Sequence, residues 1–159
     1  MTARMPSWLP ASARTDLALL KADLKPAARL WVNVPLVEVR RWARRNGFFL
    51  SGDRDGFVVL SRQPAIARRV LELDRRPGKH TAALGKMLGY PVCCTRAAAR
   101  GGDEGIDHRH DVIAARRFHG LFALINPKDY LEGRGLLSHV PCTHNCAASL
   151  VLALRTPMC

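Results

Sequence analysis

Hydrophobic and polar positions follow a helical period through most of the chain. Apolar residues recur three and four positions apart over residues 15–24, 33–47 and 64–76, and this spacing predicts three amphipathic helices. Thr15 and Asn33 stand at the starts of the first two segments, where a side-chain oxygen typically caps the first free backbone N–H groups. The first half of the chain is therefore predicted to be largely helical.

Residues 48–61 break this period. Two short apolar runs, FFL and FVVL, flank the sequence Gly-Asp-Arg-Asp-Gly. Glycine and aspartate between two apolar runs are typical of the turn of a β-hairpin. One small hairpin is therefore predicted between the helices.

The second half returns to helical spacing in shorter segments. Helices are predicted over residues 81–88, from Pro91 to about residue 100, and over residues 111–125, where Asp111 is the expected N-cap. The segment GGDEGIDHRHD before the last of these predicts a loop. A final apolar helix is predicted to start near Cys142. With one hairpin and six or seven helices, the expected fold class is α+β and mainly helical.

The length of the chain fits a single compact domain. It has 159 residues, of which 48% are hydrophobic and 24% charged. Two prolines in the first dozen residues predict an irregular arm over residues 1–12, followed by one domain over residues 13–159. No apolar run approaches the roughly 20 residues of a membrane helix, and no secretory leader is expected. We therefore expect a soluble cytoplasmic protein without a membrane partner, in which structural disulfides are disfavoured.

Four of the five cysteines stand in two short stretches, LGYPVCC and HVPCTHNC, within the region 80–155. Each stretch has a proline before its cysteines and a predicted helix start, where the helix dipole favours a thiolate. Cys142 and Cys146 are four residues apart, so they would share one helix face. If the two stretches meet, Cys93, Cys94, Cys142 and Cys146 form a metal site for zinc or an iron–sulfur cluster.

The residues leave several alternatives open for this site. Side chains of adjacent residues diverge on a helix, so only one of Cys93 and Cys94 need be a ligand. The four thiols also fit a metal-free redox site or ordinary packing of small side chains. His144, between two cysteines, is a candidate fourth ligand or general acid/base, and His139 is a candidate for the same catalytic role or for metal binding.

Positive charge marks a second candidate surface. The formal net charge is +12, which favours partners with phosphates or carboxylates. Arg40, Arg41, Arg44 and Arg45 form one basic helix surface that could bind an anionic substrate or a nucleic acid. Aromatic residues make up only 6%, and no RNP, KH or helix-turn-helix pattern is present, so a solvated helix face is the alternative.

The two cysteine stretches also resemble a known pattern. Leu-Gly-Tyr-Pro-x-Cys-Cys and His-x-Pro-Cys-x-x-x-Cys, here within residues 81–154, are similar to motifs of the uncharacterised prokaryotic DUF483 proteins. The resemblance implies no activity; it implies only that the four cysteines, with His139 and Pro141, occupy motif positions.

Two functional hypotheses follow. The first is a metal-dependent enzyme whose thiolates hold an iron–sulfur cluster or a zinc ion. Its basic side chains would orient a small substrate, and their charge would favour an anionic one. The second is a non-catalytic, zinc-stabilised basic module that binds RNA or DNA, with the metal-free redox protein as a further alternative. The sequence indicates neither the reaction nor an oligomeric state.

Overall fold

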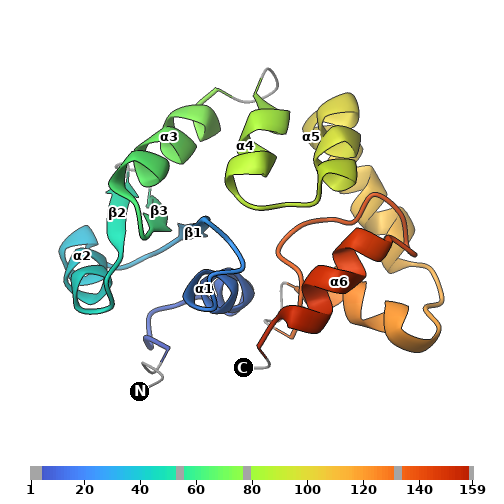
Figure 1. Ribbon diagram of the computed structural model, residues 1–159, viewed down its shortest axis with the longest axis horizontal. Helices are drawn as coiled ribbons and strands as arrows, with labels where there is room; N and C mark the ends of the chain where they lie inside the picture. The colour runs from blue at the N-terminus through green and yellow to red at the C-terminus, as the bar shows by residue number, and fades with distance from the viewer. Residues whose placement is uncertain (1–4, 53–55, 77–79, 131–133, 158–159) are drawn as a thin grey trace.

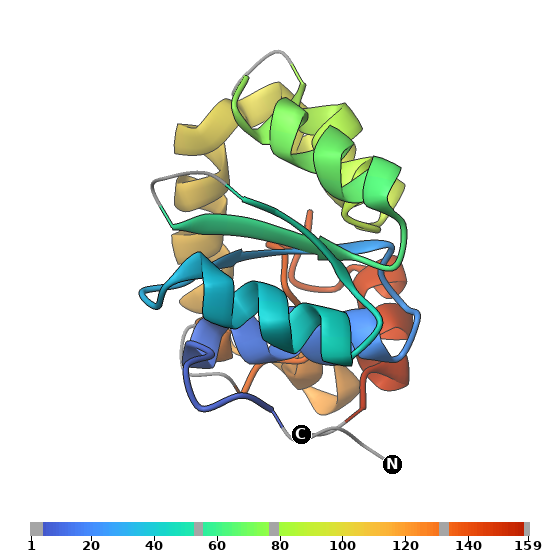
Figure 2. The same cartoon turned by 90° about the vertical axis from the view of Figure 1, so that its left-hand side faces the viewer.

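A three-stranded sheet lies between two helical layers in the N-terminal half of the fold, and the remaining helices pack beside it (Figures 1 and 2). Helices α1 (Arg14–Lys21) and α2 (Leu36–Arg45) cover one face, and α3 (Pro64–Asp74) covers the other. The structure, a computed structural model, describes residues 5–52, 56–76, 80–130 and 134–157. The expected α+β, mainly helical single domain is confirmed.

The sheet is antiparallel, in the order β1-β3-β2. Strands β2 (Phe49–Gly52) and β3 (Phe57–Ser61) form the predicted hairpin, and β1 (Ala27–Trp31) pairs with the other edge of β3. Ser61 in β3 stands opposite both Ala27 and Phe49. Strand β1 was not predicted, because its five residues lie in a segment that shows no clear alternation of apolar and polar positions.

Alternating strand residues separate two cores. Leu30, Val58 and Leu60 are buried against α1 and α2, in what we call the N-terminal core. Val59 points to the opposite face and packs against α3 and α4. Residues 5–12 of the predicted arm lie against the N-terminal core, where Leu9 is buried.

The C-terminal half consists of helices with a core of their own. Its elements are α4 (Thr81–Met87), α5 (Val92–Ala114), the 3-10 helices η2 (Gly120–Ile125) and η3 (Pro127–Asp129), and α6 (Ala147–Arg155). The buried residues of this C-terminal core are Cys94, Ile125, Leu137, Cys146 and Ala153. Two of these five are cysteines, so the core of this half is built around the two cysteine stretches.

Helix α5 corrects the prediction for the glycine-rich segment. The segment predicted as a loop, residues 101–111, lies within α5. The helix is interrupted by one kink at Gly102, whose positive φ of 61° is a conformation that glycine adopts more readily than other residues. Arg109 Nη2 donates to the carbonyls of Ala97 and Gly105, on either side of the kink, at 3.0 and 3.3 Å. The expected helix over residues 111–125 is also wrong: residues 111–114 are the last turn of α5, and within the rest of this range only residues 120–125 are helical, as the 3-10 helix η2.

Three helix starts also differ from the prediction. Thr15 does not cap α1 but lies within it, and its hydroxyl donates to the Gly135 carbonyl at 2.5 Å. The N-cap of α2 is Pro35 rather than Asn33. The last helix, α6, begins at Ala147 instead of near Cys142.

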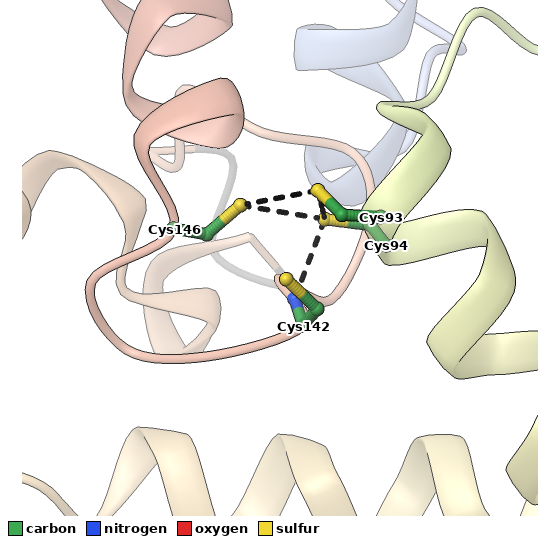
Figure 3. Close-up of side chains that lie close together, drawn as sticks. All are labelled: Cys93, Cys94, Cys142 and Cys146. Atoms are coloured by element: carbon green, nitrogen blue, oxygen red, sulfur yellow. Dashed lines mark hydrogen bonds between the residues drawn. The ribbon is translucent and has the colours of Figure 1, made fainter.

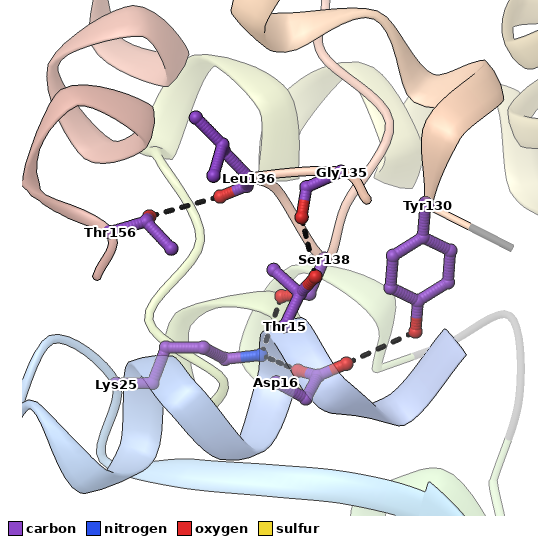
Figure 4. A network of polar contacts seen from close by, with 8 residues as sticks. All are labelled: Thr15, Asp16, Lys25, Tyr130, Gly135, Leu136, Ser138 and Thr156. Atoms are coloured by element: carbon purple, nitrogen blue, oxygen red, sulfur yellow. Dashed lines mark hydrogen bonds and ion pairs between the residues drawn. The ribbon is translucent and has the colours of Figure 1, made fainter. Parts of the chain in front are cut away.

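A buried polar network joins the two halves (Figure 4). The ammonium of Lys25 forms an ion pair with Asp16 and donates to Ser138 Oγ at 2.8 Å, while Tyr130 donates its hydroxyl to Asp16 at 3.1 Å. Lys25 and Asp16 are 3% and 2% exposed, so both charges depend on these partners. The network fixes α1 against the segment that leads to the second cysteine stretch.

Of the helices described, none has the length and apolar character to cross a membrane.

Candidate metal centre

The two cysteine stretches meet at the junction of α5 and α6 (Figure 3). Pro91 is the N-cap of α5, which places Cys93 and Cys94 in the first turn of that helix. Cys146 is the N-cap of α6, and Cys142 lies in the turn that precedes it. The expectation that Cys142 and Cys146 share a helix face is wrong, because the chain from one to the other is a turn that curves around the centre.

The four sulfur atoms lie close together. All of them are within 4.8 Å of one another. Cys146 Sγ is 3.7 Å from Cys93 Sγ and 3.7 Å from Cys94 Sγ, and the adjacent pair is separated by 3.9 Å. Both adjacent cysteines therefore point to a common centre, and the four residues could hold a metal ion.

Hydrogen bonds surround the two buried sulfurs. The Cys142 backbone N–H donates to Cys94 Sγ at 3.3 Å, and the Ser149 N–H donates to Cys146 Sγ at 3.5 Å. Ser149 Oγ is a further 3.3 Å from Cys94 Sγ. Amide N–H groups stabilise sulfur as a thiolate, the form that binds metals.

The thiol pKa values differ with these surroundings. Burial raises the pKa of Cys94 well above its usual range. Burial, followed by hydrogen bonds to Cys146 and Cys93, raises the pKa of Cys142 to about 11. Burial also acts to raise the pKa of Cys146, but the hydrogen bonds from Ser149, Cys142 and Cys93 outweigh it and lower the pKa to about 7. Cys146 is therefore the first of these three thiols to ionise, and a bound cation would be needed to ionise the others at neutral pH.

The two candidate histidines occupy different positions. His139 Nε2 lies 3.0 Å from Ser149 Oγ, and its ring packs on the Tyr90 ring with 5.0 Å between centroids. His139 thus contacts a residue that contacts the sulfurs. His144 is half-buried in the turn between Cys142 and Cys146 but is not part of the four-residue ligand group. The catalytic roles of both histidines stay predictions.

His139 is expected to make stability depend on pH. Burial, followed by the charge of Lys25, lowers its pKa from 6.5 to about 3. Between these pH values the unfolded chain binds a proton at His139 that the folded chain does not. The contribution of the neutral His139 ring to the free energy of unfolding is therefore complete above pH 6.5 and is lost as the pH falls toward 3. On going from pH 7.5 to 5.5, wild type should lose about 1 kcal/mol more of its free energy of unfolding than His139→Gln, measured by urea unfolding with zinc present. Equal losses in the two proteins would contradict the expectation.

A cavity of about 550 Å³ adjoins the centre. Its walls come from α3, α4, α5 and residues 138–140, and it reaches both Cys94 and His139. We call it the α4–α5 cavity. Its volume falls within the usual range for small-molecule sites, which is about 300–1,000 Å³.

The predicted basic surface lies elsewhere in the fold. Arg40, Arg41, Arg44 and Arg45 are exposed on α2, in the N-terminal half, whereas the cysteines lie at α5 and α6 (Figure 1). Over the part of the chain that is described, no carboxylate pairs with these arginines. The structure therefore does not bring them to the thiol centre, and their binding of a substrate or a nucleic acid stays a prediction.

Several residues around the centre and the cavity were not singled out from the sequence. Ser149 had a usable signal, because it stands three residues after the N-cap Cys146, where capping interactions recur. Thr95 and Arg109 carried no such signal, since they look like ordinary positions of a helix. Both line the cavity, and the position of Thr95 there depends on the packing of α5 on α4, a tertiary contact that the sequence does not display.

Comparisons with known proteins give no match: no family model, no curated protein and no solved structure is similar to this chain. The resemblance of the two motifs to DUF483 proteins stays a prediction. Inferences about function therefore come from the geometry of the residues.

Proposed function

We propose that the four cysteines bind a single Zn²⁺ ion as thiolates, and that this ion stabilises the C-terminal half of a small-molecule-binding protein. The observation that carries the proposal is the mutual distance of the four sulfurs, all within 4.8 Å. In a tetrahedral site with zinc–sulfur bonds of about 2.3 Å, neighbouring sulfurs are about 3.8 Å apart. The separations of 3.7, 3.7 and 3.9 Å match this value.

The same distances favour one ion over an iron–sulfur cluster. In a cluster each thiolate binds an iron at the outside of the inorganic core, and thiolates on different irons are held farther apart. Here no pair among the four sulfurs exceeds 4.8 Å. A core of several irons and sulfides would have to push the four side chains outward, whereas one ion fits between them.

Four thiolates fill the coordination shell, which supports a structural role for the ion. Catalytic zinc keeps one position open for water or substrate, while structural zinc is closed by four protein ligands. A closed shell leaves no place for His144 as a ligand and does not support chemistry at the metal. The ion would instead join the start of α5 to the start of α6 across the C-terminal core, and so fix one wall of the α4–α5 cavity.

Metal analysis of the purified protein tests this proposal. We expect one zinc per chain and less than one-tenth as much iron, in a colourless protein. Replacing zinc by Co²⁺ should give the visible absorption and the sulfur-to-cobalt charge-transfer bands of a tetrahedral tetrathiolate. A brown protein containing several irons and sulfides per chain, or a chain that folds with four free thiols and no metal, would refute it.

A further inference from the structure

We propose that the α4–α5 cavity binds a small organic carboxylate, with its apolar body inside the cavity and its carboxylate held by Arg109 and Arg76. The inference goes beyond the zinc ion and does not depend on which metal the cysteines bind. It rests on three features of the cavity: buried polar atoms without partners, an apolar wall, and an excess of positive charge.

Three polar atoms in residues that line the cavity have no hydrogen-bond partner. They are Thr95 Oγ1, Arg109 Nη1 and His139 Nδ1, and in the described part of the chain they are the full set of buried side-chain nitrogen and oxygen atoms in this condition. Each unpaired buried group costs about 1–3 kcal/mol. All three belong to residues that line one cavity, and this supports a bound molecule that supplies the missing partners, because buried polar groups are otherwise almost always satisfied.

Two of these residues are held firmly. Arg109 Nη2 donates to the Ala97 and Gly105 carbonyls, whereas Nη1 of the same guanidinium is buried and has no partner among the described residues. Thr95 is 7% exposed and stands beside Gly85, where a Cβ atom would come within 2.9 Å of its side chain. A glycine at this point thus lets α4 and α5 approach each other closely, and this fixes the position of the Thr95 hydroxyl.

Between these polar groups the wall is apolar. Three helices contribute to this wall: it is lined by Leu73 of α3, Leu84 of α4 with Leu88 directly after it, and Ile106 of α5. Side chains of this kind favour a hydrocarbon body over water, by about 25 cal/mol for each Å² of apolar surface removed from water. A ligand with an apolar body therefore fits the inside better than a sugar or a free phosphate.

The charges that line the cavity favour an anion. Asp16 is neutralised by Lys25, and Asp74 pairs with Arg29 at 2.8 Å. This leaves the guanidinium groups of Arg76 and Arg109 against one carboxylate, that of Asp103. Arg76 is exposed, so it stands where the cavity meets solvent and where a carboxylate could keep part of its hydration.

A matched pair of probes tests charge and shape separately. 1-Naphthaleneacetate and 1-naphthaleneacetamide have the same body, but only the first is an anion. By titration calorimetry with the metal-loaded wild type, we expect one molecule of the acetate to bind per chain, at least about tenfold more tightly than the amide, since hydrogen bonds to charged groups are the stronger ones. Arg109→Gln and Arg76→Gln should each reduce this preference severalfold while binding of the amide persists.

The Arg76 variant and one further variant keep the test independent of folding. Arg109 braces the kink of α5, so its variant is the one at risk of losing structure. Arg76 is exposed and forms no ion pair with a described residue, so its variant should keep the fold. Leu84→Trp should fill the cavity and weaken both probes at least tenfold. Metal content and circular dichroism equal to wild type would show that the fold persists. Equal binding of the two probes, no binding of either one to wild type, or unchanged binding to Leu84→Trp would overturn the proposal.

Discussion

Cys146→Ser is expected to release the metal ion and to unfold the C-terminal core, while the sheet and the helices on it stay folded. Structural zinc contributes about 10–16 kcal/mol of binding free energy, most of which depends on an intact thiolate shell. Cys146 is 5% exposed and caps α6. A serine in its place removes a thiolate ligand and a buried sulfur contact, whereas its hydroxyl can still cap the helix, so the expected loss comes from the metal centre. Hydrogen exchange read by mass spectrometry should show lost protection over residues 120–130 and 134–155 and retained protection over residues 57–71.

Cys93→Ser provides a graded comparison. Cys93 is the exposed member of the four, so water can occupy its place in the shell. This variant should keep its fold and bind zinc, but lose it faster to a chelator than wild type does. Thr143→Ser, a change at an exposed position of the same turn, should match wild type in zinc content and exchange. Full zinc content and unchanged exchange in Cys146→Ser would contradict the single-ion centre.

The difference between these two cysteines shows how far the sequence could describe the site. The clustering of four cysteines into LGYPVCC and HVPCTHNC, each behind a proline, predicted one metal site if the two stretches meet, with a redox site or ordinary packing as alternatives. Their geometry was not available from spacing, because the path from Cys142 to Cys146 is a turn closed around the sulfurs rather than a helix. Which thiol is exposed and which is buried depends on how α5 meets α6, and this is a property of the tertiary structure.

For the fold, too, the sequence predicted some elements and missed others. The period of apolar residues predicted α3, α4 and the hairpin well, because each of these elements buries one regular face. Strand β1 and the kinked helix α5 were missed because their stabilising interactions are not periodic. Strand β1 is defined by its pairing with β3, and the glycine-rich part of α5 by the bonds that Arg109 makes across the kink. Non-local bonds of this kind override local preference.

Lys25→Met is expected to destabilise the whole protein by about 3–5 kcal/mol, because it leaves a buried carboxylate without its cation. The Lys25 side chain has no exposed surface and that of Asp16 is 3% exposed, so water cannot replace the lost charge. After the change, the Tyr130 hydroxyl would be the one remaining donor to Asp16 among the residues drawn in Figure 4. Urea unfolding with zinc present measures the loss as a lower midpoint with an unchanged slope.

Two comparisons separate the buried charge from the loss of a long side chain. Arg69→Met removes the cation of an exposed pair, in which the side chains of Arg69 and Glu72 are 57% and 62% exposed, and should change stability by less than about 1 kcal/mol. The double variant Asp16→Asn/Lys25→Met removes both charges and should be more stable than Lys25→Met alone, because no uncompensated charge stays buried. If the free energy of unfolding of Lys25→Met lies within about 1 kcal/mol of the wild-type value, the ion pair does not hold α1 to the segment at Ser138. If it is strongly destabilised and the double variant partly recovers, the contact between the two halves depends on a charge pair that is costly to bury and more costly to break.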